Sequence, residues 1–562
     1  MHYAVTPLSG GHRYGIRQVF TAQAAGACDL YLPVWIPGSY MRRDFARLLY
    51  GLKARVNGKE TPVIFRSPSA WTIEAQAGAE VVLDYEVYAR ELSVRGNYLD
   101  HERGFFNPCA ACIAVQGRED DEHRLQLALP DTFAHWQIAG APHTNGAFIF
   151  RDYDHLIDTP LMLGKNLHIA EFAACGVPHR IVVSGEAGCF DMARLVRDVA
   201  AACREAIAMF GGLPPAAGRY DFLLHLTDSG YGGLEHRAST LLMASRHDLP
   251  TPGMEKKSAG YIQLLGLFSH EYFHTWNVKD LKPRDFQPYR LQAEQPTEML
   301  WLFEGFTAYF DDLLLLRAGV ISEEEYLNLL ARNISAYWQR RGKAHQTLAQ
   351  SSFEAWTKLY NGGENTQNAS TTYYGHGALF AFCLDAWLQA HGHTRLDAIL
   401  KALWQQYRED GAGLTEAAFR DFVLAQLPEE QHEAFRDFLR RGLHSTETLP
   451  LAWAGEQMRW GIEAATENGN RSECGFRWQG AEMAAQQLDP DSAAARAGLA
   501  VDDRIVAVNR LKAAPERLRQ WLLAAAPGSL VTLHVFRDGV LHDITFTLAE
   551  APAITCKIHR KP

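Results

Sequence analysis

The chain lacks several features that would assign it to a specialised class of protein. None of its apolar runs is longer than that over residues 378–384, which ends at Asp385 and is far shorter than the roughly 20 residues that a membrane span needs. Its nine cysteines are an odd number scattered along 562 residues, which is not the pattern of a disulfide framework. Cys109 and Cys112 have no second pair to complete a zinc site, so we interpret them as small buried residues.

An excess of positive charge and a leader segment are also missing. Lys and Arg number 55 against 65 Asp and Glu, a formal net charge of −10, and no basic run exceeds two residues. A chain this acidic is a poor candidate for binding nucleic acid. Residues 1–7 contain neither a basic segment nor an apolar core, so no signal peptide is visible. We therefore expect a cytoplasmic protein that binds neither nucleic acid nor a membrane.

The composition is otherwise that of a globular protein, with 47% hydrophobic and 21% charged residues. At about 150 residues per domain, the length predicts three or four domains. Residues 1–170 contain short alternating runs separated by turns such as Pro37-Gly38-Ser39, with little helical periodicity. This pattern predicts a β-rich, sandwich-like domain. One of its predicted strands covers residues 30–36.

Two further zones follow. In residues 171–455 apolar residues recur at three- and four-residue spacing, which is typical of helices, after a predicted strand at 222–226. The predicted helices cover residues 261–276, 299–316, 326–338, 378–388 and 396–407. Residues 460–552 return to a β-rich pattern, with a short helix near 515–523 and a hairpin at Asp538-Gly539. The sequence therefore predicts a multidomain α+β protein.

The strongest functional signal is the segment His270-Glu271-Tyr272-Phe273-His274. On a helix, residues i and i+4 share a face, so both imidazoles can bind one Zn²⁺ while Glu271 acts as general base. The alternative is an ordinary amphipathic helix with two surface histidines. The flanking residues are apolar on most sides. Because unpaired buried polar groups cost several kcal/mol, a metal ion is favoured as their partner.

A catalytic zinc ion needs a third protein ligand and an open fourth position. Glu304 is the candidate, because it lies in another strongly apolar segment, residues 301–309, where a carboxylate is costly unless it is ligated. A salt-bridged core glutamate is the alternative. We expect one zinc ion per chain, held by His270, His274 and Glu304.

These motifs resemble those of the gluzincin metallopeptidases, whose thermolysin-like domain takes its zinc ligands from two helices. Here 29 residues separate His274 from Glu304, more than is usual in those enzymes. The excess falls in residues 279–295, which we expect to loop out. The resemblance implies a mostly helical, thermolysin-like catalytic domain that hydrolyses peptide bonds.

A glycine-rich segment upstream also resembles these enzymes. Gly232-Gly233-Leu234-Glu235-His236 is similar to the exopeptidase signature G-x-M-E-N, in which the glutamate binds the free α-amine of the substrate. The resemblance implies that Gly232, Gly233 and Glu235 bind substrate. His236 stands in place of the asparagine, and its role is open. The alternative is a glycine-rich turn with a solvated glutamate.

Residues 373–378, with the sequence Tyr-Tyr-Gly-His-Gly-Ala, resemble the Y-x-K-G-A segment of the same enzymes. Aligning the Gly-Ala pair implies that Tyr374 donates its hydroxyl to the oxyanion of the tetrahedral intermediate. His376 stands where lysine is common, and its role is also open. The alternative is that Tyr374 only packs at the start of a helix.

Segments near the two ends of the chain indicate which gluzincin family the sequence resembles. Residues 492–509 are similar to the core of a bacterial PDZ domain, with Gly475-Phe476 as its carboxylate-binding loop. Residues 37–47 resemble the N-terminal β domain of the glycyl aminopeptidase family of PDZ-containing gluzincins. The resemblance covers nearly the whole chain in the family's order of domains. The expected domains are a β-rich domain at 1–170, a catalytic domain at 171–455 and a PDZ domain at 460–552.

The resemblance implies a zinc aminopeptidase acting on peptides with N-terminal Gly or Ala, and a PDZ domain that binds C-terminal peptides. Two alternatives stay open. One is a zinc endopeptidase, in which Glu235 has no amine to bind, and the other is a PDZ-based peptide-binding scaffold with a vestigial metal site. The specificity pocket, the role of the PDZ domain and self-association do not follow from the sequence.

Overall fold

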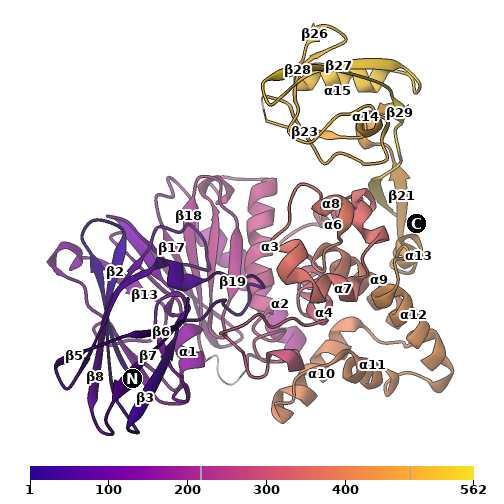
Figure 1. Cartoon of the computed structure of the whole chain (residues 1–562). Coiled ribbons are helices and arrows are strands. Elements are labelled where there is room, and N and C mark those ends of the chain that lie inside the picture. The colour runs from indigo at the N-terminus through magenta and orange to yellow at the C-terminus, as the bar shows by residue number, and fades with distance from the viewer. Residues whose placement is uncertain (215–217, 481, 562) are drawn as a thin grey trace. The chain divides into compact units, whose positions relative to one another are not determined.

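The computed structural model describes residues 1–214, 218–480 and 482–561 (Figure 1). The chain folds into two compact units, each of which gathers segments that are apart in the sequence. The first unit holds Met1–Thr297, Phe310–Ser322 and Leu400–Thr415, and the second holds Glu298–Tyr309, Glu323–Ile399 and Glu416–Pro562. All nine cysteines are free. Among the described residues, no helix combines the length and apolar character that crossing a membrane requires.

The first unit begins with a β-rich domain, as the alternating pattern predicted. Its largest sheet has seven strands, in the spatial order β14 (Ala147–Phe150), β12 (His123–Leu127), β1 (His2–Leu8), β2 (Arg13–Thr21), β8 (Glu80–Tyr88), β4 (Leu49–Val56) and β5 (Lys59–Thr61). Buried and more exposed residues alternate along β1, β2 and β8, because successive side chains of a strand point to opposite faces.

Two four-stranded sheets complete this domain. One has the order β13 (Gln137–Ala139), β15 (Leu161–Gly164), β10 (Arg103–Phe106) and β9 (Tyr98–Leu99). The other has the order β11 (Ala114–Val115), β3 (Gly26–Tyr31), β7 (Ala70–Ala75) and β6 (Ile64–Ser67). The short helix α1 (Tyr153–Ile157) begins after Asp152, whose side chain accepts the N–H of His155, and is followed by Asp158.

The strand predicted over residues 30–36 forms only at its beginning, since β3 ends at Tyr31. Val34 donates its N–H to the carbonyl of Leu291 at 2.8 Å, and its own carbonyl accepts the N–H of Arg43 at 2.7 Å. The backbone groups of Val34 are therefore satisfied by two loops, one nearby and one distant in the sequence. A local pattern cannot distinguish such pairing from a sheet ladder.

A mixed five-stranded sheet follows, in the order β16 (Leu167–Ala174), β17 (Val177–Ser184), β18 (Tyr220–Thr227), β20 (Ser239–Ser245) and β19 (Gly232–Glu235). The strand predicted at 222–226 is β18, which is buried at every position, as expected for a central parallel strand. Helix α2 (Met192–Phe210) packs against β16 and against α3 (Ala259–Phe273), and α3 packs against β19 and β20 (Figure 1). The sheet thus places Glu235, the last residue of β19, beside the helix that carries the histidines.

After α3 the chain runs as an irregular segment as far as residue 299. Its one short turn of helix is η5 (Arg284–Phe286), which agrees with the expected loop at 279–295. The helix predicted over 299–316 is interrupted, because Glu304 separates α4 (Leu300–Phe303) from α5 (Gly305–Arg317). Backbone hydrogen bonds nevertheless continue through Glu304, whose N–H donates to Leu300 and whose carbonyl accepts from Ala308, both at 2.8 Å.

The helices predicted at 326–338, 378–388 and 396–407 are α6 (Glu323–Gln339), α9 (Gly375–His391) and α10 (Leu396–Asp410). The structure adds helices that were not predicted, which are α7 (Leu348–Phe353), α8 (Thr366–Ala369), α11 (Glu416–Leu424), α12 (His432–His444) and α13 (Leu451–Gln457). Helix α9 contains the apolar run at 378–384 and is buried at every position from residue 376 to 388. It packs against α4, α6 and α13, as expected for a helix that is hydrophobic on all sides.

The C-terminal segment forms a sheet with a hydrophobic core of its own. The strand order is β23 (Arg477–Gln479), β24 (Ala484–Gln486), β25 (Arg504–Val508), β27 (Leu530–Arg537) and β28 (Val540–Thr547), with β26 (Leu511–Lys512) beside β25 and with helices α14 (Ala493–Arg496) and α15 (Pro515–Ala524). The predicted hairpin at Asp538-Gly539 joins β27 to β28.

Two short ribbons connect this sheet to the rest of the second unit. They pair β21 (Trp460–Ala465) with β30 (Thr555–Arg560), and β22 (Ser472–Glu473) with β29 (Ala549–Glu550). The chain therefore enters and leaves the C-terminal sheet through paired strands, and β30 packs against α6.

Candidate metal centre and active site

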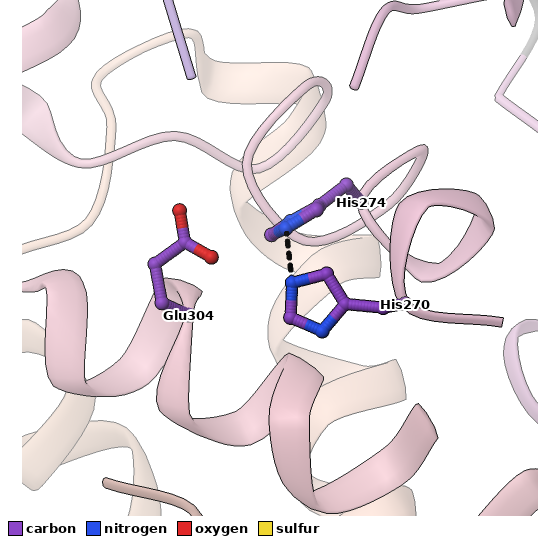
Figure 2. Close-up of side chains that lie close together, drawn as sticks. All are labelled: His270, His274 and Glu304. Atoms are coloured by element: carbon purple, nitrogen blue, oxygen red, sulfur yellow. Dashed lines mark hydrogen bonds between the residues drawn. The ribbon is translucent and has the colours of Figure 1, made fainter. Parts of the chain in front are cut away.

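His270 and His274 lie at the C-terminal end of α3, where their side chains share a face of the helix. Their Nε2 atoms are 3.2 Å apart (Figure 2). Two nitrogen ligands of a tetrahedral zinc ion, each about 2.0–2.1 Å from the metal, stand about 3.3 Å apart. The observed spacing is therefore that of two ligands of one ion.

The opposite ring nitrogens set the orientation of both imidazoles. Nδ1 of His274 lies 2.8 Å from the carbonyl of Asn277, so it must carry the proton, and Nδ1 of His270 lies 3.0 Å from Oδ2 of Asp311. A neutral imidazole has one N–H, so both Nε2 atoms then present lone pairs towards each other. Two converging lone pairs repel unless a cation lies between them. This donor set fits a metal ion, and such partners at the second ring nitrogen are usual for metal-binding histidines.

Glu304 completes the group. Ligand atoms of His270, His274 and Glu304 all lie within 4.8 Å of one another, and Figure 2 shows the three side chains converging. The Glu304 residue is 2% exposed, so its carboxylate needs a partner of opposite charge. Asp311 follows seven residues later on α5, which places it on the same face two turns along. One helical segment thus supplies both Glu304 and the carboxylate that orients His270.

Glu271 belongs to a second buried cluster of side chains, which also contains Glu235 and His274. Ligand atoms of Glu235, Glu271 and His274 also lie within 4.8 Å of one another, and the two glutamates are 4% and 5% exposed. Glycines give them room: a Cβ on Gly233 would lie 2.1 Å from Oε1 of Glu271, and one on Gly38 would lie 2.5 Å from Oε2 of Glu235. Gly233, which the sequence predicted at the site, therefore leaves space for Glu271, and Gly38, which was predicted only as a turn residue, leaves space for Glu235.

Gly232 precedes this pair with a φ of 151°, a conformation that favours glycine. A Cβ on Gly232 would lie 3.4 Å from Nη1 of Arg95. Gly232 therefore shapes the start of β19, while Gly233 is the glycine that faces Glu271 directly.

Tyr374 precedes α9, and its hydroxyl oxygen lies 3.0 Å from that of Tyr360. Burial of its hydroxyl, followed by the negative charge of Glu304, raises the pKa of Tyr374 well above its usual value. The hydroxyl therefore keeps its proton and can donate it in a hydrogen bond. Tyr360 was not identified from the sequence. It follows the π-helical turn Ala355–Leu359, and no motif marks it.

The two histidines whose roles the sequence left open have structural partners. Nδ1 of His236 lies 3.2 Å from Oδ1 of Asp158. Nδ1 of His376 lies 3.0 Å from Oγ1 of Thr371, and its ring packs on Tyr337. Burial, aided by nearby positive charges, lowers the pKa of His376 to about 3, so the ring is neutral. It cannot supply the positive charge of the lysine that is common at this position.

Comparison with known families agrees with this geometry. A model of the M61 glycyl aminopeptidase family matches residues 263–380, which hold His270, His274, Glu304 and Tyr374. A model of the peptidase M61 N-terminal domain matches residues 2–165. No curated protein matches the chain.

Two solved structures are similar. An aminopeptidase N family protein from Idiomarina loihiensis is 34% identical, with 100% of this chain and 98% of that chain covered and a TM-score of 0.95. An M1 zinc metallopeptidase from Deinococcus radiodurans is 15% identical, with 80% of this chain and 94% of that one covered and a TM-score of 0.48, too low to bear on the argument. Together with the two family models, the full-length similarity shows that this chain is a peptidase of the M61 glycyl aminopeptidase family.

Proposed function

We propose that the protein is a zinc aminopeptidase that removes the first residue from peptides with Gly or Ala at the N-terminus. The observation that carries this proposal is Glu235, a second buried carboxylate within 4.8 Å of ligand atoms of Glu271 and His274. A carboxylate beside the reacting bond can bind the α-ammonium group of a substrate. This contact fixes the N-terminus of the peptide, so that the bond after the first residue is the one that is cut. The preference for Gly is supported by the description of the family.

His270, His274 and Glu304 would hold the zinc ion. Zinc at such a site supplies Lewis-acid chemistry, because it makes water nucleophilic at neutral pH and polarises a peptide carbonyl. Glu271 would take a proton from the attacking water and pass it to the leaving amine. The buried position of Glu271, with Gly233 against its carboxylate, holds it ready for this transfer.

Two further groups would act on the substrate. The Tyr374 hydroxyl donates a hydrogen bond to the oxyanion of the tetrahedral intermediate, and in a dry site one such donor lowers the barrier by several kcal/mol. The hydroxyl of Tyr360, 3.0 Å away, orients that of Tyr374. Glu235 accepts hydrogen bonds from the substrate ammonium.

A pair of peptides that differ only in N-terminal acetylation tests the aminopeptidase proposal. We expect the wild type to cleave the free-amine peptide and to leave the acetylated one nearly uncut. Glu235→Gln keeps the shape of the side chain but loses its charge, so kcat/KM for the free-amine peptide should fall about tenfold to a hundredfold. Glu60→Gln, at an exposed strand position, is the matched control. Equal cleavage of both peptides by the wild type would instead indicate an endopeptidase.

For the C-terminal sheet we propose a PDZ domain, at about residues 460–552, that binds the C-terminal ends of peptides. A cavity of about 940 Å³ supports this proposal, because Gly475 and Phe476, Trp478 of β23, and Leu522 of α15 line it together with residues 338–341 of the helical part of the chain. PDZ domains bind an extended peptide beside a strand and hold its carboxylate in a backbone nest. The boundaries 1–170 and 171–455 for the other two domains remain part of the same proposal.

A further inference from the structure

The buried carboxylate of Asp158 lies outside the candidate active site and contacts two segments that flank this site. Asp158 follows α1 in the N-terminal β-rich domain, and its side chain is 8% exposed. Its Oδ1 lies 2.8 Å from Nζ of Lys279 and 3.2 Å from Nδ1 of His236, and its Oδ2 accepts the N–H of Arg237 at 3.0 Å. Lys279 comes shortly after His274, and the other two partners directly follow Glu235.

The first connection reaches the turn that orients His274. The N–H of Lys279 donates to the carbonyl of His274 at 3.0 Å, and the carbonyl of Asn277 accepts from Nδ1 of His274 at 2.8 Å. Between them, Val278 has a φ of 115°, which a β-branched residue rarely adopts. A strained conformation of this kind persists only when its surroundings hold it. The ion pair of Lys279 with Asp158 is a buried anchor for this turn.

The second connection reaches the end of β19. His236 and Arg237 continue the chain beyond Glu235, the last residue of that strand, and both donate to the Asp158 carboxylate. The His236 side chain is 2% exposed, so its contact with Asp158 is closed to solvent. The position of this segment therefore depends on the same carboxylate as the turn after His274.

Asp158 and Lys279 stabilise each other's charged forms. Burial alone would raise the pKa of Asp158, but Lys279, Arg237 and the hydrogen bond from His236 hold it well below its usual range. Burial alone would lower the pKa of Lys279, but Asp158 raises it. Removing one partner of such a pair leaves an uncompensated buried charge.

We propose that Asp158 is a positioning residue for both halves of the active site. Through Lys279 it sets the turn that orients the ligand His274, and through His236 and Arg237 it sets the position of Glu235. The N-terminal β-rich domain thereby takes part in building the site. The Glu235 half of this inference rests on the aminopeptidase proposal, whereas the His274 half rests only on the metal-binding group.

Three variants separate the two connections. The zinc affinity is measured by letting the apo protein compete with a chelator for zinc. Asp158→Asn should lower this affinity about tenfold or more, because loss of a residue that orients a metal ligand usually has an effect of this size. It should also reduce, about tenfold, the ratio of kcat/KM for the free-amine peptide over the acetylated one, mainly through KM. Lys279→Met should lower the zinc affinity more than the ratio, because the Lys279 charge also interacts with Glu235, and His236→Phe should lower only the ratio.

Asp503→Asn is the matched control. Asp503 is 0% exposed, pairs with Arg537 at 2.7 Å and accepts the N–H of Ala500 at 2.8 Å, all in the C-terminal sheet. This variant should lose thermal stability but keep the wild-type zinc affinity and peptide ratio. The inference is overturned if Asp158→Asn stays within twofold of the wild type in both measurements, or if Asp503→Asn changes them equally.

Failure to fold has a separate control, because Lys279→Met and His236→Phe leave Asp158 in place. If these two variants change both measurements alike, the effect is a general loss of structure and the inference is wrong. If the wild type cleaves the acetylated peptide as well as the free one, the aminopeptidase proposal fails. In that case the zinc affinities of Asp158→Asn and Lys279→Met alone decide the His274 half.

Discussion

At the scale of single residues, the site combines groups that are costly to bury with partners that stabilise them. His270 and His274 each have an oxygen at Nδ1, and their Nε2 atoms converge with Glu304 on one point. Glu271 lies beside this point with Gly233 against its carboxylate. The base chemistry that we propose for Glu271 depends on this packing, because a mobile carboxylate could not hold and return a proton at one atom.

Glu271→Gln should remove catalysis without removing the metal. The amide cannot take a proton from water, and general acid–base catalysis contributes about 10²- to 10⁴-fold to the rate. Glu271 is absent from the group formed by His270, His274 and Glu304, so zinc content should be unchanged. Steady-state kcat and metal analysis by mass spectrometry check the two expectations. A variant with a near-wild-type rate would contradict the assigned base.

Residues of the site differ in how visible they are in the sequence. The histidines and Glu304 stand out because polar side chains interrupt strongly apolar helices. Tyr360 and Asp158 do not, since neither belongs to a sequence motif that indicates a site. Their importance lies in contacts with residues distant in the sequence, and no local pattern carries that information.

At the scale of elements, the position of Glu304 depends on how closely two helical segments approach. A Cβ on Gly305, at the start of α5, would lie 2.6 Å from Cα of Gly377 on α9. Such an approach is open only to glycine. This contact packs the segment directly after Glu304 against α9, the helix that Tyr374 precedes. Periodicity predicted both helices, but neither the break nor this close approach, because both arise from packing between segments.

Gly377→Ala should destabilise the protein by about 1–3 kcal/mol, the usual cost of overpacking. The new Cβ would meet Cα of Gly305 at 2.9 Å and the carbonyl of Trp301 at 3.0 Å, both backbone atoms that cannot move alone. Gly375→Ala is the control, since its Cβ would find its nearest neighbour, on Thr372, at 3.8 Å. Urea unfolding measures the difference. Equal stability of the two variants would contradict the close packing.

At the scale of the whole molecule, buried neutral histidines link folding to pH. Burial, followed by the positive charge of Arg103, lowers the pKa of His225 to about 3. Burial likewise lowers the pKa of His376 to about 3. An unfolded histidine has a pKa of about 6.5, so between these values the unfolded chain binds protons that the native protein does not. The free energy of unfolding therefore decreases as the pH falls below about 6.5.

Each such histidine should add about 1.4 kcal/mol per pH unit to this loss of stability. His225 packs against the rings of Tyr98 and Phe105, so His225→Phe should preserve the packing and remove one titrating group. The free energy of unfolding, measured in urea from pH 7.5 to 5, should then depend less steeply on pH than in the wild type. An unchanged slope would show that His225 does not contribute.

The sequence by itself determined the nature of the chemistry. The i, i+4 spacing of His270 and His274 depends only on the geometry of a helix. The spacing of hydrophobic residues along the chain predicted α3, α9 and the β-rich ends of the chain. Tertiary structure alone decided which distant residues complete the site. Asp311, Tyr360 and Asp158 act through contacts between segments that the chain order does not specify, because side-chain contacts form only once the elements pack.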